Sequence, residues 1–104
     1  AGPALGEPFG PGLNDALLRG LRAAVTTREG TAGLAFEGFA LPGVEVWGKT
    51  GTAQRTGRSD TSLFAAVAQG GGRCVSVVAV VEEAGFGSAV AAPLVRRVIE
   101  AVFT

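Results

Sequence analysis

Apolar residues recur along the chain with two different periods, which divide it into helical and strand-like parts. In the first quarter they are spaced three and four apart, the period of an amphipathic helix, and we predict a helix over residues 14–28. Asn14 and Asp15 offer N-cap chemistry at its start. The apolar stripe consists of Leu13, Leu17, Leu21, Ala24 and Val25.

From Val44 onward, apolar and polar residues alternate instead, as they do in β-strands. We predict one strand beginning at Val44, a second at residues 63–69 and a third at residues 74–83, with the three glycines at 70–72 as a hairpin turn. The third segment is a nearly continuous apolar run with five valines. Such a run predicts burial on both faces, or on one face with tight cover on the other.

The end of the chain returns to helical spacing. Ser88 is a candidate N-cap, and Pro93 lies in the first turn, where a missing N–H is tolerated. The predicted apolar side is formed by Leu94, Val95, Val98, Ile99, Ala101 and Val102, and the solvent side by Arg96, Arg97 and Glu100. The element order predicts an α/β (α+β) fold, in which an N-terminal and a C-terminal helix flank three antiparallel strands. Its third strand would have an unpaired edge, which with an uncovered sheet face predicts self-association.

The composition of the chain excludes several classes of function. The 104 residues form at most one small domain. Residues 1–12 contain three prolines and four glycines and are expected to be a flexible lead-in. The absence of an initial Met indicates an excised fragment. Nine basic and nine acidic residues without a cluster exclude a nucleic-acid footprint. No histidine and a single cysteine exclude a His/Cys metal site, a Ser-His-Asp triad and a disulfide. Cys74 opens an apolar run, so we predict a buried thiol.

One stretch, GVEVWGKTGTAQ at residues 43–54, matches two motifs. Gly43, Gly48, Lys49 and Thr50 satisfy the pattern of a phosphate-binding loop. That loop requires a buried strand before its first glycine and a helix that begins at its Lys-Thr. The preceding residues end in Pro42, and the following ones carry no helical stripe, so nucleotide binding is rejected.

The second motif is Lys-Thr-Gly-Thr at the end of a strand, as in β-lactamases and penicillin-binding proteins. Alternation places Lys49 and Gly51 on one face, and Thr50 and Thr52 on the other. Gly51 removes a Cβ where another chain must lie close. Such a strand could hold the carboxylate of an extended peptide by hydroxyl and backbone contacts, in the positive field of Lys49. Four residues alone do not distinguish this from a solvated strand end.

The order of segments around the motif is more specific. The chain resembles the C-terminal part of the transpeptidase domain of class B (high-molecular-weight) penicillin-binding proteins, over about residues 13–103. The matching segments, in order, are LNDALLRGLRAAVTTREGTA, VWGKTGTAQ, LFAAVAQ, VVAVVEE and GFGSAVAAPLVRRVIEAVF. The implied fold is a fragment of the penicillin-binding protein and serine β-lactamase-like fold.

This resemblance implies a serine D,D-transpeptidase that cross-links peptidoglycan stem peptides ending in D-Ala-D-Ala, through an acyl-serine that β-lactams such as penicillin also form. Lys49 matches a catalytic lysine of the charge network, and the backbone N–H of Thr52 an oxyanion-hole donor. Thr50, Gly51 and Thr52 match substrate-binding positions. No cofactor, metal, nucleotide or nucleic acid is implied. The parent would act at the extracytoplasmic face of the bacterial cell membrane.

The departure from the family pattern concerns the nucleophile. The family's other motifs are S-x-x-K and S-x-N, and none of the four serines, Ser59, Ser62, Ser76 and Ser88, begins either one. The resemblance implies that both lie in the missing upstream part of the parent, so the fragment alone is predicted to be inactive. A serine β-lactamase, a D,D-carboxypeptidase and a non-enzymatic binding module of the same fold remain alternatives.

Overall fold

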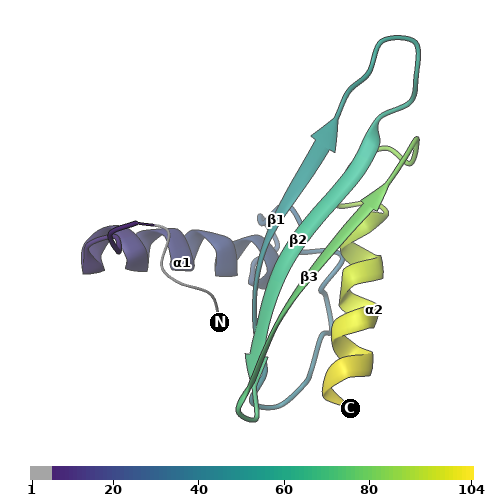
Figure 1. Cartoon of the computed structure of the whole chain (residues 1–104). Coiled ribbons are helices and arrows are strands. Elements are labelled where there is room, and N and C mark those ends of the chain that lie inside the picture. Colours follow the sequence, from purple (N-terminus) through teal and green to yellow (C-terminus); the bar gives the residue numbers. More distant parts are fainter. Residues whose placement is uncertain (1–5) are drawn as a thin grey trace.

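Two helices and a three-stranded antiparallel sheet make up the computed structural model, which describes residues 6–104 (Figure 1). The strands are adjacent in sequence order, β1-β2-β3. The predicted fold class, with one helix before the strands and one after them, is therefore confirmed. The initial residues of the expected lead-in, 1–5, lie outside the described residues. The elements are α1 (Pro11–Thr26), β1 (Glu45–Ala53), β2 (Thr61–Gly70), β3 (Arg73–Val81) and α2 (Ala91–Phe103).

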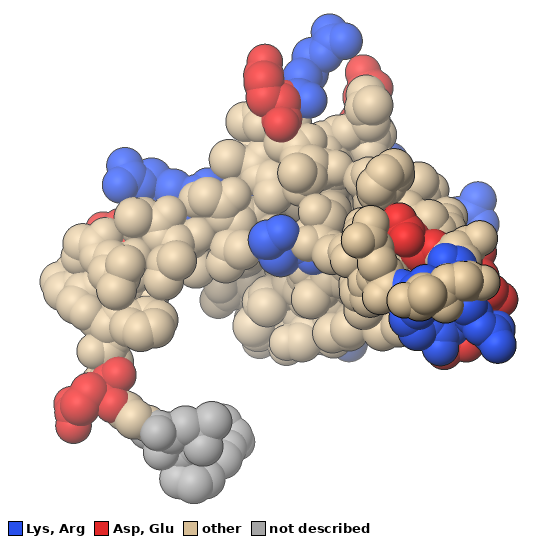
Figure 2. Space-filling view, turned by 90° about the horizontal axis from the view of Figure 1, so that it is seen from above, with Lys and Arg blue, Asp and Glu red and all other residues tan. Residues whose placement is uncertain are grey.

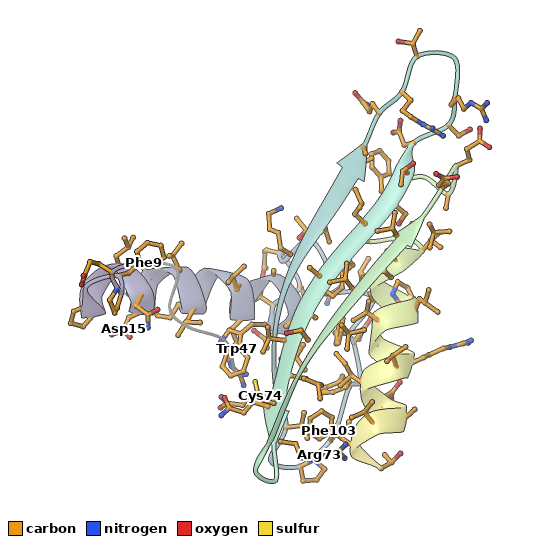
Figure 3. The ribbon with its side chains drawn as sticks, viewed as in Figure 1. Phe9, Asp15, Trp47, Arg73, Cys74 and Phe103 are labelled. Carbon is orange, nitrogen blue, oxygen red and sulfur yellow. The ribbon has the colours of Figure 1, made fainter. Side chains whose placement is uncertain are left out.

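The sheet has two faces of different character. The inner face packs against α2 and against the connector, residues 27–43, whereas the outer face points away from α2. Trp47 and Cys74 lie on the outer side, and Arg73 lies with Phe103 beside the end of α2 (Figure 3). Buried inner-face residues are Val46, Gly48, Ser62, Phe64, Ala66, Ala68 and Ala79.

The core lies between the inner face and α2. Phe64 is 1% exposed, and its ring centroid lies 5.9 Å from that of Phe36 in the connector. Val95 and Ile99 of α2 are fully buried in the same cluster. Gly48 makes room for this packing, because a Cβ there would collide with the Phe64 ring. Apolar burial of this kind is the main favourable term in folding.

Arg96 of α2, which the sequence pattern predicted on the solvent side of the helix, binds the connector. Arg96 Nη1 donates to the carbonyl oxygens of Ala35 at 3.1 Å and Glu37 at 2.6 Å. Its guanidinium also lies 5.8 Å from the ring centroid of Phe39. The prediction was wrong for Arg96 because the connector, which carries no periodic signal, covers that side of the helix.

Both predicted helix starts were wrong. α1 begins at Pro11 after Gly10, with no side-chain cap, so Asn14 and Asp15 lie within the helix. The fixed φ of proline suits the first helical position. α2 begins at Ala91 after Val90, and Ser88 does not cap it, although Pro93 does lie in its first turn.

The apolar stripe of α1 is buried only at its C-terminal end. The helix projects from the sheet (Figure 1), and Phe9 and Asp15 lie at its far end (Figure 3). Leu13 and Leu17 are 54% and 45% exposed, whereas Val25 is 5% exposed. The period identified the helix correctly but did not show where its partner surface ends.

β3 is less buried than its sequence predicted. Val78 and Val80 are 66% and 59% exposed on the outer face, and Cys74 is exposed as well. The prediction of a strand covered on both faces, with a buried thiol, was therefore wrong. β3 lies at an edge of the sheet, and only alternate residues such as Ala79 contact the core.

Charged groups form no broad patch of one sign on the face seen in Figure 2, where blue and red side chains are interspersed over a mostly uncharged surface. None of the helices in residues 6–104 is long and apolar enough to cross a membrane.

Candidate functional site

The Lys-Thr-Gly-Thr motif occupies the second half of β1, at an edge of the sheet. β2 pairs with one side of β1, and the register sets Lys49 opposite Ala65 and Thr52 opposite Ser62. On its other side β1 has no neighbouring strand among the described residues. Because Lys49 and Thr50 lie within a strand, no helix N-terminus is available there for a phosphate. The segment is therefore not a phosphate-binding loop.

The motif lysine lies on the outer face and is exposed. Its Nζ donates to the carbonyl oxygen of Thr50 at 2.8 Å. The ion pairs found in residues 6–104 join Arg58 to Glu83 and Arg96 to Glu100, so none of them neutralises Lys49. Its charge is consequently available to an anionic ligand at this edge of the sheet.

The first motif threonine contacts the connector. Thr50 is half-buried on the inner face, and its Oγ1 lies 3.0 Å from Oγ1 of Thr31. The two residues are separated by 19 positions along the chain. Sequence reasoning had named Thr31 only as part of a matching segment, because a hydroxyl contact between distant segments leaves no periodic signal.

The second motif threonine meets the loop between β3 and α2. The Gly87 N–H points to Thr52 Oγ1 at 3.5 Å, a long hydrogen bond. A Cβ at Gly87 would collide with the carbonyl oxygens of Leu63 and Gly51, so only glycine fits here. At Gly51 itself an added Cβ would meet Leu63 Cβ at 3.3 Å. The severe close approach at the motif is therefore made by Gly87, in the loop before α2.

A buried serine holds this loop in place. Ser62 is fully buried, and its Oγ donates to the Phe86 carbonyl at 2.8 Å and accepts from the Ala91 N–H at 3.0 Å. Ser62 thus caps the start of α2 from β2, the role that Ser88 was expected to fill. Its position directly opposite Thr52 links the loop to the motif strand.

Trp47 and Lys49 border a hollow of about 320 Å³ on the outer face. The indole is half-buried, and the guanidinium carbon of Arg22 in α1 lies 5.8 Å from its ring centroid. A cation over an aromatic face is an attractive arrangement. Trp47 therefore packs against α1 within this chain.

The described residues do not bring a serine and a lysine together in a helix. Ser59 and Ser76 are exposed in a turn and in β3, Ser62 is committed to two backbone groups, and Ser88 lies in the loop before α2. No group of three or more His, Cys, Asp or Glu side chains in residues 6–104 could hold a metal ion. The arrangement offers a cation, two hydroxyls and strand backbone, which suits binding of a carboxylate-bearing peptide.

Comparison with known proteins gives a consistent result. Residues 7–100 match the family model of the penicillin binding protein transpeptidase domain. A solved structure of Pseudomonas aeruginosa PBP2 in complex with WCK 5153 superposes with a TM-score of 0.76 at 32% sequence identity. The match covers 89% of this chain and 19% of the PBP2 chain, so the chain spans about a fifth of that relative. No curated protein matches significantly.

Proposed function

The chain belongs to the penicillin-binding protein transpeptidase-domain family, and we propose that it is the C-terminal part of a class B peptidoglycan D,D-transpeptidase. The main support is the position of Lys-Thr-Gly-Thr at a free sheet edge, with the lysine on one face and the two threonine hydroxyls on the other. An extended peptide can add to such an edge through main-chain hydrogen bonds. The chain would form one wall of the active site.

Each motif residue has a distinct role in this proposal. The hydroxyls of Thr50 and Thr52 donate to the carboxylate of the stem peptide, and the charge of Lys49 strengthens that attraction. Gly51 leaves the strand backbone accessible. The backbone N–H of Thr52 donates to the carbonyl oxygen as negative charge develops on it, which is an oxyanion-hole role.

The nucleophile in this proposal is a serine of the parent outside this chain. Its Oγ attacks the carbonyl carbon of the D-Ala-D-Ala bond, the C–N bond breaks, and the terminal D-Ala leaves with a proton on its amine. An amine of a second stem peptide then attacks the acyl-serine and restores the serine hydroxyl, which completes the cross-link. Penicillin would acylate the same serine.

The rest of the parent would supply the opposite wall. The outer face carries Lys49 and the exposed valines Val78 and Val80, which no described residue covers. We place the upstream part of the parent over this face, and residues 1–104 as its C-terminal fragment. The expected lead-in of residues 1–12 is shorter than predicted, because Pro11 and Gly12 already belong to α1. Because the substrate is a cell-wall peptide, the parent would act at the extracytoplasmic face of the cell membrane.

Labelling with a fluorescent penicillin tests this proposal. The parent should form a stoichiometric adduct that survives denaturing electrophoresis, and Lys49→Ala should abolish most of it. The 104-residue chain should show no mass increase. Its single lysine, Lys49, belongs to the strand motif, so no other lysine is available to activate a serine. An unlabelled parent, or an adduct on the 104-residue chain, would contradict the proposal.

The lifetime of the adduct separates the alternatives. A transpeptidase keeps the acyl group until an amine acceptor arrives, so release should be slow in water and faster with an acceptor amine. Rapid hydrolysis of penicillin would indicate a β-lactamase, and release of D-Ala without cross-linking a carboxypeptidase. A parent whose gene encodes no S-x-x-K motif would be a binding module.

A further inference from the structure

Thr31 is held rigidly beneath the motif strand. The preceding residue, Gly30, packs so closely on the end of α1 that a Cβ would collide with the carbonyl oxygens of Ala23 and Ala24. The following residue, Ala32, is fully buried, and its N–H donates to the Ala24 carbonyl at 2.9 Å. The backbone on both sides of Thr31 is therefore fixed, and its hydroxyl meets that of Thr50 at 3.0 Å.

The direction of this hydrogen bond matters for anion binding. Either hydroxyl can donate across this 3.0 Å contact, because the hydrogen on each Oγ1 atom can rotate. A hydroxyl has one hydrogen to donate and two lone pairs to accept, whereas a carboxylate only accepts. If Thr50 donates to a bound carboxylate, its hydrogen is no longer available to Thr31. The 3.0 Å contact then persists only if Thr31 becomes the donor.

We propose that Thr31 is a positioning residue, whose hydroxyl donates to Thr50 when a carboxylate binds and so holds Thr50 as a donor to that carboxylate. Thr31 is exposed, so its hydrogen is free to rotate toward Thr50 without loss of a buried partner. The carboxylate accepts from Thr50, Thr50 accepts from Thr31, and every hydroxyl keeps a partner. Successive hydrogen bonds of this kind polarise and strengthen one another. The inference rests on the carboxylate-binding role proposed above for Thr50.

Replacement of Thr31 in the full-length parent tests this role. Thr31→Val keeps the shape of the side chain but cannot donate, and it should lower the second-order rate of acylation by benzylpenicillin about fivefold, the size of one hydrogen bond between neutral groups. The loss should lie in binding of the drug rather than in the acylation rate constant at saturation. Thr31→Ser should restore the rate.

A probe without the anion separates positioning from a general structural effect. The methyl ester of benzylpenicillin has no carboxylate, so Thr31→Val and wild-type parent should be acylated by it at equal rates. Thr26→Val is the matched control, because Thr26 is also exposed and, within residues 6–104, its hydroxyl bonds only to the Arg22 carbonyl of its own helix. That variant should match wild type with both probes. In Thr50→Val, the added Thr31→Val change should cost nothing further.

Several results would overturn the inference. Equal slowing with acid and ester, no slowing with the acid, or no rescue by serine would each show that Thr31 does not act through the carboxylate. A wild-type parent acylated at a normal rate in those experiments leaves the proposed function intact. A wild-type parent that is never acylated removes the proposed function, and the role of Thr31 falls with it.

Discussion

The two faces of the same three strands differ sharply in how much of their packing this chain provides. On the inner face, Phe64 and Ala68 are 1% and 0% exposed beneath α2 and the connector. On the outer face, Val67 and Val78 are 39% and 66% exposed, although β-branched residues suit a covered sheet. The chain therefore covers most of the inner face itself, whereas on the outer face it leaves Val67 and Val78 exposed and covers Trp47 only in part, with α1.

The motif strand divides its functional groups between these faces. Thr50 and Thr52 point to the inner face, where Thr31 and Gly87 contact them. Lys49 lies on the outer face, where no described residue neutralises it. The threonines are thus oriented by this chain, whereas the surroundings of the lysine depend on what covers the outer face. Substitutions on the two faces should have different consequences.

The largest difference in stability between the two faces is expected when an apolar side chain is truncated. Phe64→Ala on the inner face should lower the free energy of unfolding of the 104-residue chain by about 3–5 kcal/mol, because it removes a buried ring and leaves a cavity. Val78→Ala on the outer face should change it by less than about 0.5 kcal/mol. Urea unfolding followed by Trp47 fluorescence measures both. Equal losses would mean that the outer face is buried in solution.

A smaller contrast is expected for two serines. Ser62→Ala should cost about 1–3 kcal/mol, because the Phe86 carbonyl and the buried Ala91 N–H both lose their partner. Ser76→Ala, on the exposed outer face of β3, should be nearly neutral. Hydrogen exchange at Ala91 gives a local measurement, since its N–H should exchange faster only in Ser62→Ala. Unchanged protection in that variant would show that Ser62 does not hold the loop.

Local periodicity predicted the elements but not their environment. The change of period at Val44 located the strands, and the spacing from Leu13 to Val25 located α1, because both patterns depend only on neighbouring residues. The same patterns failed for Cys74 and β3, since an apolar run has the same spacing in an edge strand as in a central one. Whether Val78 is covered depends on the position of β3 in the sheet.

The candidate site was predictable only where a motif names it. Lys49 through Thr52 were identified from four consecutive letters and their resemblance to a family. Thr31, Ser62 and Gly87 were missed, because each acts through a contact with a residue that is distant in sequence. A glycine at a position where a Cβ would collide with a carbonyl oxygen cannot be distinguished in the sequence from a glycine in an ordinary turn.

The smallest effect of the difference between the two faces is expected for self-association of the isolated chain. The exposed valines of the outer face and the edge of β3, which no strand of the described residues pairs, should let two copies associate, because apolar patches and free strand edges are both association surfaces. The mean mass in sedimentation velocity should therefore rise with concentration.

Val78→Lys should weaken the association constant about tenfold, or ~1.4 kcal/mol, since it introduces a charge into the paired surface. Leu94→Lys is the matched control, because Leu94 is 45% exposed on α2, away from the sheet's outer face, and should leave association unchanged. A wild-type chain that stays monomeric at every concentration, or an equal effect of the two lysines, would show that the outer face does not pair with a second copy.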